Sequence, residues 1–283
     1  MNASESEQFW SNVLTFAQAT TQQVGETLLN DFGSAQPQEK ADGSLVTASD
    51  EWADATLRGA IATTFPDHGV LSEEVEHIFP DTDWCWIIDP IDGTTNFARN
   101  IPIWGISLGL LYKGTPVFGF VHIPPLNQSF HGYWYGESGL TGPIGAFMNG
   151  QPLQVRQDDP SGTQVFSLCA RSLKMLKVEQ PFPCKIRMLG SATYNILLVA
   201  RGVAIGAVEA TPKIWDIAAV WPIVQAAGAC WEALDDEPIF PLVPGQNYGH
   251  QSFLTLVVNK SELVPVFRPW VERLRPTNGD KAA

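Results

Sequence analysis

Two aspartates, Asp89 and Asp92, lie three residues apart directly after an apolar segment at residues 84–88. This segment reads Trp-Cys-Trp-Ile-Ile, a β-prone run that is typical of a strand covered on both faces. We expect the strand to end at Asp89, because Pro90 removes a backbone donor, and a tight turn to aim both carboxylates at one point. Carboxylate oxygens are the ligands that hard divalent cations prefer, so the pair is a candidate metal site.

A short polar segment follows the second aspartate. Gly93 allows the backbone to bend or to approach a ligand closely, and residues 94–96 read Thr-Thr-Asn, typical of a helix start. The first amides of a helix lack partners within it and attract anions. Two carboxylates beside such a helix start therefore predict a combined site for a metal ion and a phosphate.

Other interpretations of this motif exist. Asp, Pro and Gly are common in ordinary turns, so the motif alone is compatible with a purely structural role. An EF-hand loop fits poorly, because Ile91 would occupy its third ligand position and Gly93 comes one place too early.

The overall charge narrows the possible partners. The chain has 283 residues, a length that suits one large domain or two packed subdomains, and a net charge of −13 that argues against a nucleic-acid-binding surface. An acidic site would also repel a phosphate ester. Divalent cations held by the carboxylates would remove that repulsion.

The cysteines and the apolar segments indicate in which cellular compartment the protein is expected. Four scattered cysteines show no metal-binding spacing and are expected to be buried thiols in a reducing, cytoplasmic environment. Residues 1–8 lack the apolar core of a signal peptide, and no stretch of apolar residues is long enough to predict a membrane span.

The first half of the chain, residues 1–157, is expected to form an α+β subdomain that carries the aspartate motif. Its strands should form a mostly antiparallel sheet with turns at Lys113-Gly114 and Asn149-Gly150, and residues 40–44 could serve as a lid or as a solvated connection. The helices are predicted at residues 4–30 and 49–64, and the later strands at 103–112, 116–123 and 129–135.

The second half, residues 158–283, is expected to form an α/β subdomain, because strand and helix patterns alternate along it. Pro222 falls inside one predicted helix and should kink it or shift its start, although nothing in the sequence explains its presence there. The strands are predicted at residues 164–169, 185–189, 204–209 and 253–258, and two of the helices at 191–200 and 217–227.

Further acidic residues have both structural and chemical interpretations. Thr47 and Asp50 have the spacing of a helix cap and its partner acid, and a second role for Asp50 in touching a catalytic group stays open. Glu73 and Glu74 follow a short β-prone segment. Adjacent glutamates usually lie at the surface, yet one of these could lie at a strand end near Asp89.

Taken together, these motifs resemble those of the inositol monophosphatase family of magnesium-dependent, lithium-sensitive phosphatases. Residues 86–97 read Trp-Ile-Ile-Asp-Pro-Ile-Asp-Gly-Thr-Thr-Asn-Phe, and residues 215–219 read Trp-Asp-Ile-Ala-Ala, like the two family signatures. The family's Gly-Glu-Glu and Leu-Val-Thr-x-x-Asp motifs correspond to residues 72–74, where serine replaces glycine, and to residues 45–50. The resemblance spans roughly residues 10–270.

The resemblance implies a layered αβαβα sugar-phosphatase fold with a Mg²⁺ site. It implies that Glu73, Asp89 and the backbone carbonyl of Ile91 hold one Mg²⁺. Asp89, Asp92 and Asp216 would hold a second ion. Hard oxygen ligands of this kind agree with the chemistry of Mg²⁺.

The resemblance also implies the catalytic and phosphate-binding groups. The phosphate would lie on the amides of Gly93 and Thr94. Thr94, oriented by Asp50, would act with Glu73 to activate the attacking water. No cysteine or histidine nucleophile is needed, and the five histidines, which lie outside these motifs, are expected to be structural or at the surface.

Substrate identity is less sharply indicated. Related enzymes act on inositol phosphates, histidinol phosphate, fructose 1,6-bisphosphate or phosphoadenosine phosphate. Glu209 lies six positions before Trp215, where inositol phosphatases place a glutamate that contacts inositol hydroxyls; a role as a surface carboxylate stays open. A carboxylate suits a neutral polyol and would repel a second phosphate. The substrate contacts implied by the resemblance are Gly190, Ser191, Ala192, Glu209 and Asp216.

The sequence therefore predicts a Mg²⁺-dependent phosphomonoesterase that acts on myo-inositol monophosphate. Histidinol phosphate or another sugar-like monophosphate is the alternative substrate. A metal-binding scaffold without catalysis is a remote alternative, because every expected ligand is present. The family resemblance also implies a homodimer and inhibition by lithium.

Overall fold

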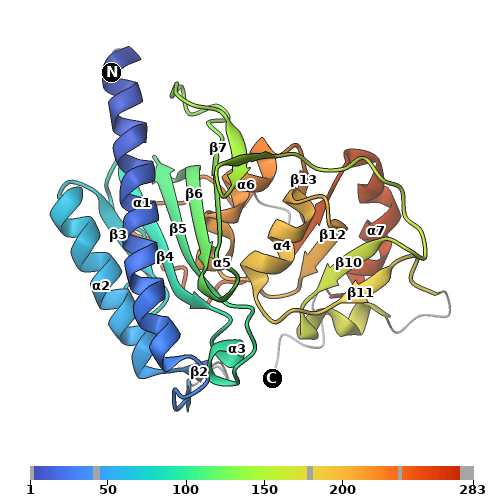
Figure 1. The fold of residues 1–283 in the computed structure, drawn as a ribbon. Coiled ribbons are helices and arrows are strands. Elements are labelled where there is room, and N and C mark those ends of the chain that lie inside the picture. Colours follow the sequence, from blue (N-terminus) through green and yellow to red (C-terminus); the bar gives the residue numbers. More distant parts are fainter. Residues whose placement is uncertain (1–2, 41–44, 177–180, 235–237, 275–283) are drawn as a thin grey trace.

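The computed structural model describes residues 3–40, 45–176, 181–234 and 238–274. Helices and two large β-sheets alternate in five layers (Figure 1), the αβαβα arrangement that the family resemblance implies. Of the possible lid at residues 40–44, residues 41–44 lie outside the described part. No helix in the described ranges is long and apolar enough to cross a bilayer.

The larger sheet has seven strands in the order β3-β4-β5-β6-β7-β8-β9. β3 runs parallel to β4 and the other neighbours are antiparallel. Left-handed residues form the predicted tight turns at Lys113-Gly114 and Asn149-Gly150. The strands are β3 Gly69–Ser72, β4 Trp84–Asp92, β5 Gly105–Tyr112, β6 Thr115–Ile123, β7 Gln128–Tyr133, β8 Gly145–Met148 and β9 Gln151–Leu153.

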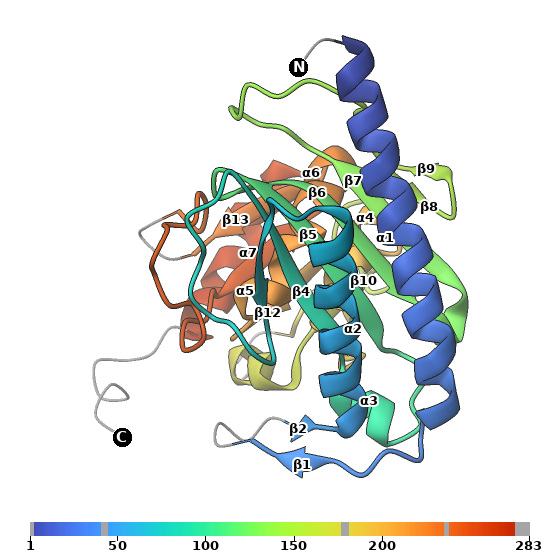
Figure 2. The same ribbon diagram turned by 90° about the vertical axis from the view of Figure 1, so that its left-hand side faces the viewer.

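Two helices, α1 (Ala3–Asp31) and α2 (Ala48–Thr64), cover one face of this sheet (Figure 2). The first was predicted from the spacing of its apolar residues, and the second from the Thr47–Asp50 cap that precedes it. The buried side of α1 includes Val13, Ala17 and Val24, whose side chains are fully enclosed. Burial of this face stabilises a helix that propensity alone would not hold.

The middle helices and the second sheet come from the second half of the sequence (Figure 1). The strand order is β11-β10-β12-β14-β13, with β10 parallel to β11 and β12, and β14 antiparallel to β12 and β13. The strands are β10 Val165–Leu168, β11 Lys185–Arg187, β12 Ala204–Glu209, β13 Cys230–Ala233 and β14 Thr255–Val258. The helices are α4 Ala192–Ala200, α5 Ile214–Ala218, α6 Val220–Ala226 and the outer α7 Val264–Val271.

Short elements complete the chain. Strands β1 (Gln38–Glu39) and β2 (Leu45–Val46) form a small separate pair that the sequence pattern did not predict, and β13 was missed as well. These strands are too short for a period of two to stand out. The remaining helical turns are α3 Thr94–Ala98, η1 Pro124–Leu126, η2 Ala170–Leu176, η3 Ser261–Leu263 and η4 Glu272–Leu274.

The helix predicted at residues 217–227 is two helices, α5 and α6, which meet at Ala219. Pro222 explains the break, because it has no amide hydrogen to donate to the carbonyl of Ala218 and its ring crowds that carbonyl. The proline therefore divides a helix that would otherwise continue.

Three glycines bring the α5–α6 junction unusually close to the sheet. Gly109, Gly119 and Gly132 lie opposite one another on β5, β6 and β7. A Cβ atom at Gly119 would lie 1.8 Å from the carbonyl oxygen of Ala219, and one at Gly109 would lie 2.8 Å from the carbonyl carbon of Ala218. This row of glycines sets the height of α5 above the sheet.

We expect Gly119→Ala to lower the free energy of unfolding by about 1–3 kcal/mol, because the added methyl group overpacks this contact. Urea denaturation of the purified protein measures the change. Gly59→Ala is the control, since Gly59 lies at an exposed position of α2, where an added Cβ would meet no neighbour within 4 Å. That control should gain up to about 1 kcal/mol in stability from helix propensity. Equal destabilisation of both variants would contradict the packing argument.

Candidate metal and phosphate site

The end of β4 carries an irregularity that aligns its two aspartates. Asp89 pairs with Ser107 and Asp92 with Gly105, so β4 has one residue more than β5 between these pairs. In a regular strand, residues three apart point to opposite faces, and the extra residue turns both carboxylates to the same face. The prediction that the strand ends at Asp89 was wrong. Pro90 is tolerated because it lies where the bulge interrupts the ladder.

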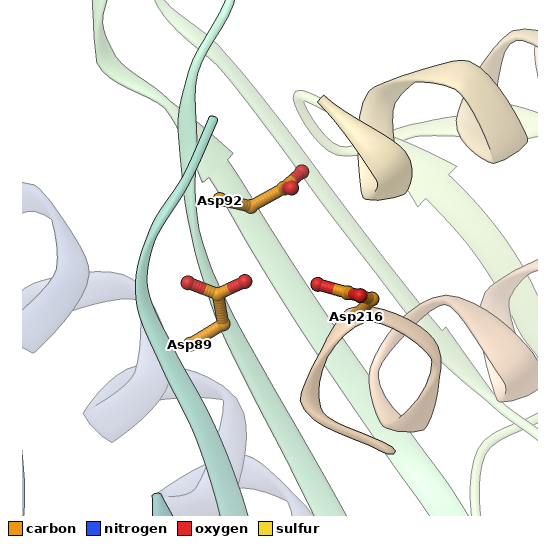
Figure 3. Close-up of side chains that lie close together, drawn as sticks. All are labelled: Asp89, Asp92 and Asp216. Carbon is orange, nitrogen blue, oxygen red and sulfur yellow. The ribbon is translucent and has the colours of Figure 1, made fainter. Parts of the chain in front are cut away.

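A third carboxylate approaches this pair from the middle helical layer. Figure 3 shows Asp216, on α5, pointing toward Asp89 and Asp92 on β4. One carboxylate oxygen of each aspartate lies within 4.8 Å of the other two. Asp216 also stabilises its own helix, because its Oδ2 accepts a hydrogen bond of 2.6 Å from the amide of Lys213 at the start of α5. Segments far apart in sequence thus converge at one point.

Glu73 lies beside this cluster, directly after β3. Its amide donates to the carbonyl of Ile88 at 3.1 Å, which ties it to β4. Its carboxylate lies 3.2 Å from the Nζ of Lys40, and that ammonium group also lies 2.9 Å from the carboxylate of Glu74. Sequence reasoning did not single out Lys40, because a lone lysine in a polar loop carries no pattern.

The carboxylates of this cluster repel one another. Burial raises the pKa of Glu73 to about 8, an effect that Lys40 offsets only in part. Burial, and then the neighbouring Asp92, raises the pKa of Asp216 to about 7. Burial and the carboxylates of Glu73, Asp92 and Asp216 raise the pKa of Asp89 well above its ordinary value. Divalent cations would relieve this repulsion, and an all-oxygen donor set fits Mg²⁺ or Ca²⁺ rather than a thiolate-seeking metal.

The metal-free protein should therefore lose stability as the pH rises from about 5 to 8, because the native state must release protons that the unfolded chain has already lost. The sign follows from native pKa values that lie above the unfolded ones. Added Mg²⁺ should raise the melting temperature, and more so at pH 8 than at pH 6. Differential scanning fluorimetry in EDTA and in Mg²⁺ measures both trends. A melting temperature that is indifferent to Mg²⁺ at every pH would rule out a cation at this cluster.

The start of α3 lies next to the aspartates. Gly93 has a left-handed φ of 97°, and a Cβ there would lie 3.1 Å from the carbonyl oxygen of Ile103 and 3.2 Å from that of Gly190. Only glycine fits this conformation and spacing without strain. The amides that follow Gly93 belong to the first turn of α3, where no helical carbonyl is available to them.

Asp50 serves two partners at once. Its Oδ2 accepts the amide of Thr47 at 2.8 Å and the hydroxyl of Thr47 at 2.6 Å, which forms the predicted capping box of α2. Its Oδ1 accepts the hydroxyl of Thr94 at 3.0 Å, and Thr94 Oγ1 also lies 3.1 Å from the carbonyl of Ile91. The second role that the sequence left open is thus a contact with Thr94.

The start of α4 is bound directly to Asp92. The amides of Ala192 and Thr193 donate to its carboxylate at 3.0 and 2.9 Å, and the hydroxyls of Ser191 and Thr193 donate as well. Asn96 also bridges to this segment through a hydrogen bond of 2.6 Å to the carbonyl of Leu189. The predicted substrate segment Gly190–Ala192 therefore lies beside the acidic cluster, with the Ala192 amide engaged by Asp92.

Glu209 ends β12 and is only 3% exposed, which excludes the role of a surface carboxylate. Its Oε1 accepts the side-chain amide of Asn195 at 2.8 Å, and Asn195 accepts the hydroxyl of Ser167 at 3.1 Å. Burial, and then the nearby Cys169 thiol, raises the pKa of Glu209 well above its ordinary value. A carboxyl group in this state can both donate to and accept from a hydroxyl.

Comparison with known proteins gives consistent matches. The chain matches the inositol monophosphatase family over residues 10–262. A histidinol-phosphatase of Chlorobaculum parvum is 33% identical over 229 residues, which cover 77% of this chain and 84% of that protein. An inositol-1-monophosphatase of Synechocystis sp. is 32% identical over 244 residues, with coverages of 81% and 82%. The solved structure of an IMPase from Thermotoga maritima has a TM-score of 0.76 at 30% identity, covering 92% of this chain and 98% of that one.

Proposed function

The chain belongs to the inositol monophosphatase family and is a phosphoric monoester hydrolase, and we propose that it hydrolyses small polyol monophosphates, myo-inositol monophosphate first, with Mg²⁺ as cofactor. The observation that carries this proposal is the convergence of Asp89, Asp92 and Asp216 beside the start of α3. A cluster of buried carboxylates is costly without a cation, and a helix start favours an anion.

The proposed metal ligands divide into two overlapping sets. Glu73, Asp89 and the carbonyl of Ile91 would hold one Mg²⁺, and Asp89, Asp92 and Asp216 would hold the other. Mg²⁺ bound there would neutralise the ester, acidify a water molecule and stabilise the leaving alkoxide. Asp89 belongs to both sets, so its carboxylate should matter more than any other in the cluster.

The remaining groups position the phosphate and the attacking water. The amides of Gly93 and Thr94 would bind the phosphate oxygens. Because Thr94 donates its hydroxyl proton to Asp50 at 3.0 Å, its oxygen can accept a hydrogen bond from the water, with Glu73 holding that water from the other side. Attack forms a new P–O bond as the bond to the polyol oxygen breaks. A proton of the water passes to Thr94 Oγ1, whose own proton moves toward Asp50. The departing alkoxide takes a proton from solvent and leaves as the alcohol.

Glu209 supports a polyol as the leaving group, because a buried carboxyl group held by Asn195 can pair with neighbouring hydroxyls. Histidinol phosphate is the second candidate, since a relative named histidinol-phosphatase is 33% identical to this chain. Histidinol carries an ammonium group in place of a ring of hydroxyls. A charged partner of this kind would need the carboxylate form of Glu209.

The variants Glu209→Gln and Glu209→Ala separate these substrates. For inositol 1-phosphate, we expect Gln to keep most of kcat/KM and Ala to lower it about 10-fold, because the amide still pairs with hydroxyls. For histidinol phosphate, both changes should lower kcat/KM alike. Turnover of p-nitrophenyl phosphate is the control, and it should change little. Equal losses on all three esters would exclude a contact between Glu209 and the leaving group.

A panel of phosphate esters assayed for phosphate release, with Mg²⁺ and with EDTA, tests the proposal as a whole. The proposal expects Mg²⁺-dependent release, fastest from inositol 1-phosphate. Faster release from histidinol phosphate would reverse the order of the substrates. Binding of Mg²⁺ without hydrolysis of any ester would favour the non-catalytic scaffold. We also propose a cytoplasmic homodimer, which sedimentation of the purified protein and localisation in cells would test.

A further inference from the structure

Glu73 and Asp216 reach the acidic cluster from different layers. The side chain of His77 contacts the backbone of Glu73 and the residue next to Asp216. The ring of His77 lies four residues after Glu73, with its Nε2 2.7 Å from the carbonyl oxygen of Glu73. A carbonyl only accepts hydrogen bonds, so Nε2 carries the proton and donates it. The same ring stacks on the indole of Trp215, with centroids 5.3 Å apart and planes 25° apart. Trp215 directly precedes Asp216.

Both backbone polar groups of Glu73 are therefore held. Its amide donates to Ile88 on β4, and its carbonyl accepts from His77. The ring of His77 rests on α5 through Trp215, so movement of either the Glu73 loop or α5 would disturb this contact. His77 thus joins the segments that carry two of the proposed metal ligands.

A second segment contacts both the backbone and the ring of His77. The amide of Tyr248 donates to the carbonyl of His77 at 2.8 Å, and Ile78 forms an isolated β-bridge with Asn247. At Gly249, a Cβ atom would lie 2.6 Å from the Nδ1 of His77, so the backbone touches the imidazole there. The carbonyl of Gly249 also accepts the Nζ of Lys213 at 3.1 Å, which ties this segment to the start of α5.

We propose that His77 is a positioning residue that sets the separation of Glu73 and Asp216 and thereby the affinity of the site for Mg²⁺. Mg²⁺ demands near-ideal octahedral geometry, so small displacements of its carboxylate ligands weaken binding. Removing a group that orients a metal ligand without itself binding the metal lowers metal affinity about 10- to 100-fold. This role rests on the proposed metal site and adds a residue that none of the sequence motifs contains.

The test measures Mg²⁺ binding by isothermal titration calorimetry on the full chain, with kcat and KM measured separately. We expect His77→Ala to raise the Mg²⁺ dissociation constant about 10- to 100-fold. Saturating Mg²⁺ should restore most of kcat, and the substrate KM should stay unchanged. His77→Gln, whose side-chain amide can still donate to Glu73, should recover part of the affinity. His77→Phe, which keeps the stacking but not the donor, should recover less.

A second variant at this contact and a control variant elsewhere complete the test. Gly249→Ala would place a methyl group 2.6 Å from Nδ1 of the ring and should weaken Mg²⁺ binding even if His77→Ala fails to fold. His131→Ala is the matched control, because His131 is another imidazole stacked on aromatic rings, those of Phe120 and Phe147, away from the cluster. It should leave Mg²⁺ affinity unchanged.

Unaltered Mg²⁺ affinity in the folded His77 and Gly249 variants would overturn the role of His77. A wild-type protein that binds no Mg²⁺ would instead refute the metal site itself.

Discussion

Asp89→Asn is expected to lower kcat/KM by about 10³-fold or more, since metal catalysis contributes several kcal/mol and each 1.4 kcal/mol is about tenfold. Asp89 lies in both proposed ligand sets and is 1% exposed, so no solvent can replace its charge. The same change should raise the melting temperature of the metal-free protein. It removes a carboxyl group that is costly to ionise there, because burial and the neighbouring carboxylates raise the pKa of Asp89.

Steady-state kinetics and a thermal scan in EDTA measure the two effects on the same preparation. Asp81→Asn is the control, because Asp81 is exposed on the loop that precedes β4. It should change neither quantity. Loss of activity together with a lower metal-free melting temperature would mean that Asp89 mainly supports the fold. Retention of wild-type activity would remove Asp89 from the site.

Thr94→Val should lower kcat by about 10²- to 10⁴-fold, the range for a positioned proton-transfer group. Valine has nearly the same shape but cannot accept a hydrogen bond from water or donate to Asp50. The change should leave Mg²⁺ affinity close to that of the wild type, because the hydroxyl of Thr94 is not among the proposed ligands. Kinetics at saturating Mg²⁺, combined with calorimetry, separates these quantities.

Thr94→Ser is the matched control, since it keeps the hydroxyl and removes only a methyl group. It should retain most of the activity. The hydroxyl also lies 3.1 Å from the carbonyl of Ile91, so a threonine that only buttresses this carbonyl would show weaker Mg²⁺ binding in Thr94→Val. Weaker Mg²⁺ binding in Thr94→Val, with kcat restored at high Mg²⁺, would mean that Thr94 positions the Ile91 carbonyl and does not transfer a proton.

Local patterns in the sequence predicted most of the elements. The apolar spacing over residues 4–30 predicted α1, and the tight turns at Lys113-Gly114 and Asn149-Gly150 came from their turn chemistry. The Thr47–Asp50 capping box was also visible in the sequence. Each of these features depends on interactions between residues that are near neighbours in the chain, so their spacing alone carries the information.

The incorrect predictions concern segments whose ends depend on contacts with a neighbouring strand or sheet. β4 continues to Asp92 because β5 accommodates a bulge there, and no local pattern announces the register of a neighbouring strand. Pro222 announced a break in the helix around Asp216, but not that α5 and α6 would meet at Ala219, which rests against Gly119 of β6. Propensity describes a segment in isolation, whereas packing decides how that segment ends.

The sequence by itself determined which residue types are available to the site, together with the family motifs that group Asp89, Asp92 and Asp216. Only the tertiary structure decided that these oxygens lie within 4.8 Å of one another. It also decided that Lys40 pairs with Glu73, and that His77 bridges the Glu73 loop and α5. The physical reason is that such contacts join remote segments, whose separation is set by how the layers pack and not by any spacing along the chain.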